Sequence, residues 1–87
     1  MGLDTIDLIL ATEKHFKVSV PDARTEKTVT VERYALLLWE LQSKSKSPLS
    51  YEQVLLQLRQ IISTMFDLPI ESVVPTANFI KDLRLDQ

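Results

Sequence analysis

Between residues 50 and 66, apolar side chains recur at the spacing of one face of an α-helix. Ser50 and Gln53 begin this stretch at the spacing of a capping box, in which each side chain accepts a hydrogen bond from the other residue's backbone amide. Asp67-Leu68-Pro69 follows and ends the pattern. The sequence therefore predicts a long helix from about Ser50 to Phe66. Its buried stripe is expected to contain Val54, Leu55, Leu58, Ile61, Ile62, Met65 and Phe66.

A second helix is expected from Leu3 to Phe16. The apolar positions of this stretch are 3, 6, 8, 9, 10, 11 and 16, and acidic residues lie among them. Asp4 and Asp7 fall in the first turns, where the helix dipole favours negative charge, and Lys14 falls near the other end, where it favours positive charge. This segment is predicted to be amphipathic.

A third helix is expected from Val31 to Gln42, with Thr30 as its N-cap. Trp39 lies off the apolar stripe of this helix, so we expect its side chain to be half exposed. The buried stripe is expected to contain Val31, Tyr34, Ala35, Leu37, Leu38 and Leu41.

The remaining segments are predicted to connect these helices. Val18 and Val20 belong to an extended connector, and a short helical turn is expected over Asp22–Lys27. The polar stretch Ser43–Pro48 has the composition of a flexible linker. Residues 70–87 are too apolar for a solvated tail, so we expect a structured loop across the bundle. Its core-facing positions are Ile70, Val73, Phe79, Ile80 and Leu83.

Composition limits the fold and the function. One glycine and four prolines leave few residues for hairpin turns, so an all-α fold in a single domain of 87 residues is expected. No cysteine is present, which excludes disulfides and cysteine nucleophiles and favours a cytoplasmic protein. No apolar run approaches the ~18 residues of a membrane span. A net charge of −2 does not favour nucleic acid as a partner.

No pattern of catalytic residues is apparent. The sequence contains no nucleophile–base set, carboxylate pair or phosphate-binding loop. His15 is the only histidine, and at a charged helix end it is expected to be solvated. The chain is therefore predicted not to be an enzyme and to bind no metal.

Two halves of the chain resemble the acyl carrier protein family. Residues 50–66 look like the first helix of that family, and the loop that follows is similar through Glu71-Ser72-Val73 and Ala77–Asp86. Leu3–Phe16 looks like the second helix of the family. Residues 20–31 look like the third helix and the start of the fourth, through Val20-Pro21-Asp22, Thr25-Glu26-Lys27 and Thr28-Val29-Thr30-Val31.

The two halves stand in the reverse of the family's order. The resemblance implies a circular permutation, in which residues 1–42 correspond to helices II–IV, residues 43–49 form a linker, and residues 50–87 correspond to helix I and its following loop. Permutation is tolerated where the original termini lie close together. The expected fold is therefore an all-α, four-helix, acyl-carrier-like bundle in the order II-III-IV-linker-I, with three longer helices and one short one.

The resemblance also implies a modification site. In the family, the serine of an Asp-Ser-Leu motif carries 4′-phosphopantetheine, and this chain has Gly2 or Gln87 at that position, depending on which half is aligned. Neither side chain supplies an oxygen nucleophile, so no attached cofactor is predicted. Thr5 is a hydroxyl in a similar setting, but using it requires a three-residue deletion before Phe16.

The second helix of the family is the surface that meets partner enzymes. The corresponding residues here are Leu3, Asp4, Ile6, Asp7, Leu10 and Glu13. The simpler interpretation is that these residues are ordinary features of an amphipathic helix. Lys14 and His15 stand where carriers usually have acids, which weakens the acidic face. Two roles are open for a set of six apolar residues: they could line an acyl-binding cavity, or they could simply form the core. These residues are Ile9, Leu37, Leu38, Leu58, Ile62 and Phe79.

The leading functional hypothesis is a non-enzymatic, acyl carrier-like module of fatty-acid, polyketide or related biosynthesis, acting through protein partners without phosphopantetheine. Three alternatives remain open. The chain could be an interaction module that reuses the carrier bundle, or an engineered permutant of a carrier. It could also join halves of two carriers from a tandem array, in which case a domain-swapped dimer is expected in place of a monomer.

Overall fold

A computed structural model describes residues 3–21 and 30–79 of the chain, with side chains from Ile6 onward. Across these residues the protein is helical and contains no strand, apart from an isolated antiparallel bridge between Thr30 and Asn78. The elements are α1 (Leu3–Phe16), α3 (Val31–Gln42), α4 (Tyr51–Met65) and the short 3₁₀ helix η1 (Ile70–Ser72). The predicted all-α class is confirmed. The predicted short helix at Asp22–Lys27 lies outside the described residues, so a total of four helices remains a prediction.

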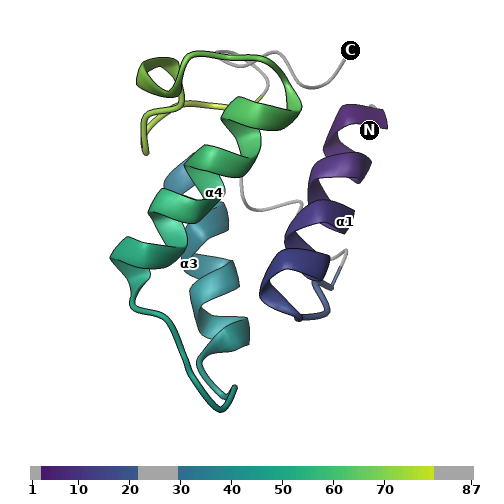
Figure 1. The fold of residues 1–87 in the computed structure, drawn as a ribbon, viewed down its shortest axis with the longest axis vertical. Coiled ribbons are helices and arrows are strands. Elements are labelled where there is room, and N and C mark those ends of the chain that lie inside the picture. The colour runs from purple at the N-terminus through teal and green to yellow at the C-terminus, as the bar shows by residue number, and fades with distance from the viewer. Residues whose placement is uncertain (1–2, 22–29, 80–87) are drawn as a thin grey trace.

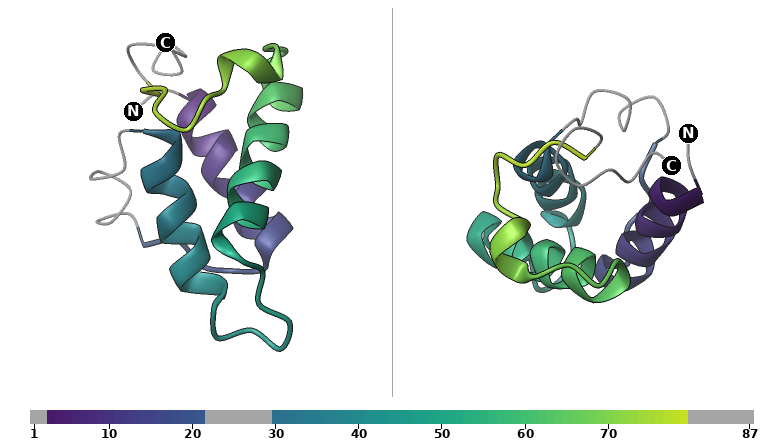
Figure 2. Two further views of the ribbon diagram at one scale, coloured as in Figure 1. Left: turned by 90° about the vertical axis from the view of Figure 1, so that its left-hand side faces the viewer. Right: turned by 90° about the horizontal axis from the view of Figure 1, so that it is seen from above.

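The three α-helices lie side by side (Figures 1 and 2). Helices α1 and α3 begin at the same end of the bundle, and α4 runs in the opposite direction and packs against both. The segment that includes η1 crosses the end at which α1 and α3 begin. The polypeptide therefore returns, after α4, to the end of the bundle where α1 starts.

Helix α4 supplies a central part of the core. The predicted capping box is present, because Gln53 N–H donates to Ser50 Oγ at 3.3 Å and Ser50 N–H donates to Gln53 Oε1 at 3.2 Å. Val54, Leu58 and Ile62 are completely buried. Met65 was expected in this stripe, but 39% of it is exposed, because it lines an open groove between α4 and α1.

Helix α3 begins and packs as its sequence predicts. The Thr30 side chain caps it by accepting a hydrogen bond from the backbone amide of Arg33. Trp39 is 36% exposed, in agreement with its position off the stripe, and Leu41 is half-buried. The buried residues of the predicted stripe are Val31, Tyr34, Ala35, Leu37 and Leu38.

A buried glutamine fixes the connection between α3 and α4. The side-chain amide of Gln42 donates to the carbonyl oxygens of Trp39 and Leu49, and its Oε1 accepts from the Leu49 backbone amide at 2.6 Å. Residues 43–48, the predicted polar linker, are all exposed. The linker is therefore solvated along its length, but its two ends are held together by one side chain.

The segment after α4 is a structured loop over the described residues, as predicted. Arg59 of α4 donates to the carbonyl oxygens of Val73 and Ile70, at 2.6 and 3.2 Å. Val73 and Ala77 are buried, and the ring of Phe79 packs edge-on against Tyr34 with centroids 6.0 Å apart. The predicted core contacts of Ile80 and Leu83 lie outside the described residues.

The loop also completes the first turn of α3. Backbone amides in the first turn of a helix have no partner inside the helix. Here the amide of Val31 donates to the Ala77 carbonyl at 3.0 Å, and the amide of Glu32 donates to the Pro75 carbonyl at 2.8 Å. The loop after α4 and the start of α3 therefore stabilise each other.

Helix α1 buries Leu8, Thr12 and Phe16, which lie four residues apart on one face. Thr12 is fully buried, and its Oγ lies 2.9 Å from the Ile9 carbonyl and 2.6 Å from Tyr34 Oη. Because the single Thr12 hydroxyl proton serves the Ile9 carbonyl, Tyr34 donates to Thr12. This contact joins α1 to α3 through the core.

The connector after α1 is extended, as predicted. Lys17 adopts a left-handed conformation with φ 56°, and the amide of Val18 donates back to the Glu13 carbonyl, a common way to end a helix. The amide of Val20 donates to the Glu13 carboxylate at 2.7 Å. Val20 is buried and Val18 is half-buried, so both valines contact the core.

The Thr12–Tyr34 contact gives an asymmetric prediction for stability. Thr12→Val leaves the buried Tyr34 hydroxyl without its partner and should lower the free energy of unfolding by about 1–3 kcal/mol. Tyr34→Phe leaves Thr12 bonded to Ile9 and should cost only about 0.5–1.5 kcal/mol. Urea unfolding followed by Trp39 fluorescence measures both variants. Equal losses in the two variants would contradict the assigned direction of the bond.

Tyr34 also gives a prediction for alkaline pH. Burial raises the pKa of Tyr34 to about 12; the Thr12 hydroxyl partly offsets this, and the charge of Glu13 adds to it. The unfolded chain ionises this tyrosine near pH 10 while the folded chain keeps it protonated, so stability should fall as the pH rises from about 10 to 12.

Between pH 10 and 12, the ionisation of Tyr34 should lower the free energy of unfolding by roughly 2–3 kcal/mol. The slope of unfolding free energy against pH should therefore be shallower in Tyr34→Phe than in the wild type. Burial, with a contribution from Glu32, also raises the pKa of Tyr51, so some slope should remain. An unchanged slope in Tyr34→Phe would contradict the assignment.

Candidate interaction surface

The inward face of α1 determines which of its residues meet solvent. Leu8, Thr12 and Phe16 point into the bundle, so residues on the opposite side of the helix point outward. Leu10 is 58% exposed and Ile6 is 41% exposed, and Asp7 next to them is also exposed. Helix α1 thus has a second, partly apolar face that packs against no other described element.

The structure brings together part of the predicted partner surface. Ile6, Asp7 and Leu10 are exposed and share the outward side of α1. Glu13 is half-buried and its carboxylate accepts the Val20 amide, so it serves the connector as well as the surface. Leu3, Asp4 and Thr5 lie in the first turns of α1, and their side chains lie outside the described part. Gly2 and Gln87, the positions equivalent to the attachment serine, also lie outside it.

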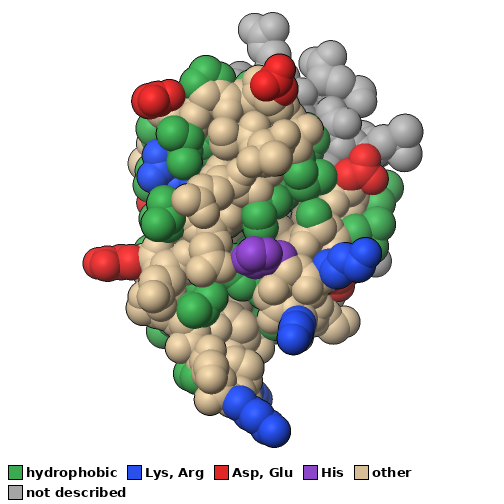
Figure 3. Space-filling model, in the orientation of Figure 1, with side chains coloured by type: hydrophobic (Ala, Val, Ile, Leu, Met, Phe, Trp, Pro, Cys, Tyr) green, Lys and Arg blue, Asp and Glu red, His purple; other side chains and the backbone are tan. Residues whose placement is uncertain are grey.

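Charge is unevenly distributed along this outward side. Asp7 lies in the first half of α1, while Lys14, His15 and Lys17 lie at its end, and all four are exposed. Over α1, Figure 3 shows an acidic group toward the upper end, basic groups toward the lower end, and apolar atoms between them. The exposed surface of α1 is therefore acidic near the start of the helix and basic near its end.

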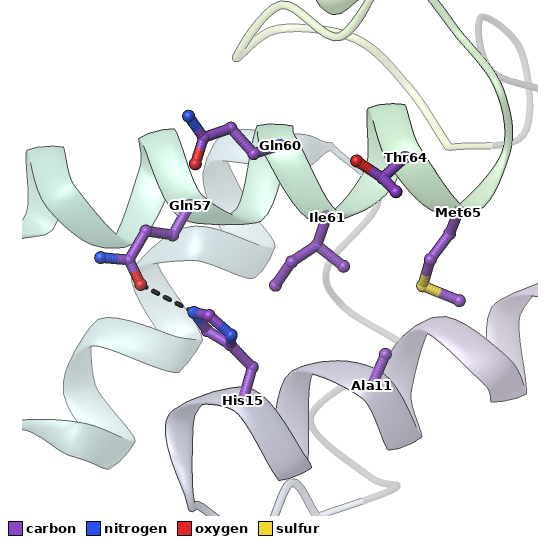
Figure 4. Close-up of a pocket in the computed structure, with 7 residues that line it drawn as sticks. All are labelled: Ala11, His15, Gln57, Gln60, Ile61, Thr64 and Met65. Carbon is purple, nitrogen blue, oxygen red and sulfur yellow. Dashed lines mark hydrogen bonds between the residues drawn. The ribbon is translucent and has the colours of Figure 1, made fainter.

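A shallow groove of about 410 Å³ separates α1 from α4 (Figure 4). Ala11, Ile61 and Met65 provide its apolar side chains, and its polar side chains include Gln57 and Gln60. His15 points from α1 toward α4, where its Nε2 lies 2.8 Å from Gln57 Oε1. His15 is thus exposed, as predicted, but it also bridges two helices at one end of the groove.

The exposed side chains of α1 can take part in binding. Within the described ranges, no group of three His, Cys, Asp or Glu side chains is placed to hold a metal ion. Among the same residues no helix is long and apolar enough to cross a membrane. The outward side of α1 can bury apolar area and pair charges with a partner, which is how interaction surfaces gain affinity and specificity.

The residues considered for an acyl cavity behave as core. Leu37, Leu38, Leu58 and Ile62 are buried in one continuous cluster, and the half-buried Ile9 and Phe79 pack against it. The two hollows on the flanks of α1 are lined by other side chains. In this conformation the six residues pack the bundle.

Several contacts at this surface were not predicted from sequence. Thr12 is polar and was not placed in the core, although its spacing of four residues from both Leu8 and Phe16 was a signal for it. The Glu13 contact with Val20 and the His15 contact with Gln57 depend on how the chain turns after Phe16 and on where α4 lies. No local pattern encodes either of them.

Neither a family model, nor a curated protein, nor a solved structure matches this chain. A function for the chain must therefore be inferred from its own residues and from the surface that the bundle exposes.

The two faces of α1 should respond differently to truncation. Leu8→Ala removes a buried side chain and should lower the free energy of unfolding by about 2–5 kcal/mol. Leu10→Ala removes an exposed one and should change it by no more than about 0.5 kcal/mol. Urea unfolding of the two variants provides the comparison. A large loss in Leu10→Ala would mean that Leu10 packs inward and that the outward face is misassigned.

Proposed function

We propose that this chain is a non-enzymatic, carrier-type module of fatty-acid, polyketide or related biosynthesis, with its helices in permuted order and α1 as the helix that docks on partner enzymes. The observation that carries the proposal is the outward face of α1. A small domain gains stability by burying large apolar side chains. Leu10 is nevertheless 58% exposed, beside the exposed Ile6 and Asp7, at positions that resemble the partner-binding helix of acyl carrier proteins.

The path of the chain supports the permuted order. In an unpermuted carrier, the loop after the first helix leads directly into the second helix. Here the loop after α4 returns to the end of the bundle where α1 begins, and Phe79 packs against Tyr34 in the first turn of α3 (Figure 2). The wiring of α4, its loop and α1 is therefore compatible with a carrier whose chain has been opened between that loop and α1.

The proposal gives α1 a defined mode of recognition. An amphipathic helix binds a groove on its partner through apolar anchors, and neighbouring charges fix its direction. Leu10 and Ile6 provide the anchors, and Asp7 provides an acid for a basic partner. Lys14 and His15, at the other end of the helix, favour acidic groups on the partner. The partner should therefore present acidic or neutral groups there.

A carrier-recognising enzyme tests this docking. The ¹⁵N-labelled chain is titrated with a broad-specificity phosphopantetheinyl transferase in the absence of coenzyme A, and amide shifts are followed. Perturbations should concentrate between Ile6 and Lys14. Leu10→Ala should weaken binding by about fivefold or more, since truncating an anchor costs about 1 kcal/mol or more. Leu56→Ala is the matched control, because Leu56 is 47% exposed on α4.

Three results would count against the proposal. The first is the absence of binding, the second is a set of perturbations centred away from α1, and the third is an equal effect of both leucine variants. Each would leave the bundle without a carrier-type docking helix.

The same enzyme with coenzyme A tests the absence of the attachment residue. Intact-mass measurement should show no added phosphopantetheine, because Gly2 and Gln87 provide no hydroxyl. A stoichiometric gain would overturn this expectation, and peptide mapping would show whether Thr5 is the modified residue. An unpermuted carrier with its attachment serine confirms that the transferase is active.

A further inference from the structure

One line of side chains on α1 is complementary to itself. Asp7, Leu10 and Lys14 are spaced by three and four residues, so they form a single stripe along the helix. All three are exposed, and neither charged group pairs with another residue in the described part of the chain. The stripe places an acid on one side of its largest apolar residue and a base on the other.

A hollow lies beside the same stripe. It is lined by Leu10, Ala11, Glu13, Lys14 and Val18. Ala11 has a small side chain and Val18 is half-buried, so the surface at these two residues is recessed relative to the exposed Leu10 side chain beside them. A protruding leucine and a recess thus lie side by side, which is the arrangement that lets one surface interlock with a copy of itself.

We propose that α1 is a self-association surface, on which a second copy of this chain binds in an antiparallel, two-fold symmetric dimer whose axis passes between Leu10 and Ala11. The symmetry follows from the spacing of the charges. Asp7 lies three residues before Leu10 and Lys14 lies four residues after it. With about 1.5 Å of rise per residue, an axis between Leu10 and Ala11 places Asp7 of one copy and Lys14 of the other at the same level, about 5 Å along the helix from the axis.

The two-fold axis then repeats that ion pair. Asp7 of each copy faces Lys14 of the other, and each Leu10 enters the hollow beside the other copy's Ala11 and Val18. A parallel arrangement would place Asp7 against Asp7 and Lys14 against Lys14, which repel each other. The charges therefore select the antiparallel arrangement.

The dimer is expected to be weak. A single helix face of this length falls below the size of a stable interface, and such contacts give transient association. It uses the face that the proposed function assigns to enzymes, so the two contacts exclude each other. The self-complementarity does not depend on that function, because it follows only from the stripe and the hollow.

Sedimentation velocity of the full chain tests the proposal, over concentrations from roughly 10 µM to 1 mM. The dimer fraction should rise with concentration and fall as salt is added, because exposed ion pairs are screened. Leu10→Ala should weaken dimerisation by about tenfold. Leu56→Ala removes another exposed leucine, on α4, and should leave dimerisation within about twofold of the wild type.

Charge reversal gives the sharpest readout. Asp7→Lys alone and Lys14→Asp alone each place like charges face to face, and each should weaken the dimer by about tenfold. The double variant Asp7→Lys/Lys14→Asp restores both ion pairs and should return the dimer to within about threefold of the wild type. Circular dichroism of each variant confirms that the helices are intact.

The contradicting outcomes are equally distinct. A chain that stays monomeric at the highest concentration overturns the proposal, and so does a dimer that is insensitive to Leu10→Ala. A double variant that fails to recover also overturns it. Restoration of the dimer by the double variant separates this inference from enzyme docking, since a basic enzyme surface would not accept Lys at position 7.

Discussion

A buried hydrogen bond between Thr12 and Tyr34 determines how α1 lies on the bundle. Thr12 is fully buried in the middle of α1, and its hydroxyl lies 2.6 Å from the Tyr34 hydroxyl of α3. Rotating α1 by one residue would turn Thr12 away by about 100° and leave the Tyr34 hydroxyl buried without a partner. Since that rotation is costly, the bond also fixes which side chains of α1 face solvent.

The composition of the outward face of α1 is a consequence of that fixed rotation. With Leu8 and Thr12 inward, Leu10 and Asp7 must be outward, and the helix presents an apolar residue flanked by charge. At the other end of the core, Arg59 holds the loop after α4 through two carbonyl oxygens. The loop then reaches the start of α3, where the Val31 and Glu32 amides donate to the Ala77 and Pro75 carbonyl oxygens.

Much of the fold could be predicted because apolar periodicity and local capping are encoded within a few residues. The helix starts at Thr30 and Ser50 follow from such local signals. Buried polar side chains were not predictable in the same way. Thr12 and Gln42 are buried because they form hydrogen bonds with Tyr34 and Leu49, respectively. Neither partner belongs to the same helix as the residue it bonds, so no local pattern predicts these contacts.

At the surface, the acid and leucine pattern of α1 was predicted. The hydrogen bond between Glu13 and the connector was not, because it depends on the turn after Phe16.

The proposed function requires that the bundle be a carrier fold whose chain has been opened at its attachment site. Rewiring the chain tests this directly. The new chain begins at Ser50, joins position 87 to Leu3 with Gln87→Ser in place, and ends at Gln42. Mass spectrometry after incubation with coenzyme A and a phosphopantetheinyl transferase is the measurement. The account predicts a helical protein that gains one phosphopantetheine, while the matched Gln87→Ala chain gains none. A rewired chain that folds and stays unmodified would contradict it, as would one that fails to fold.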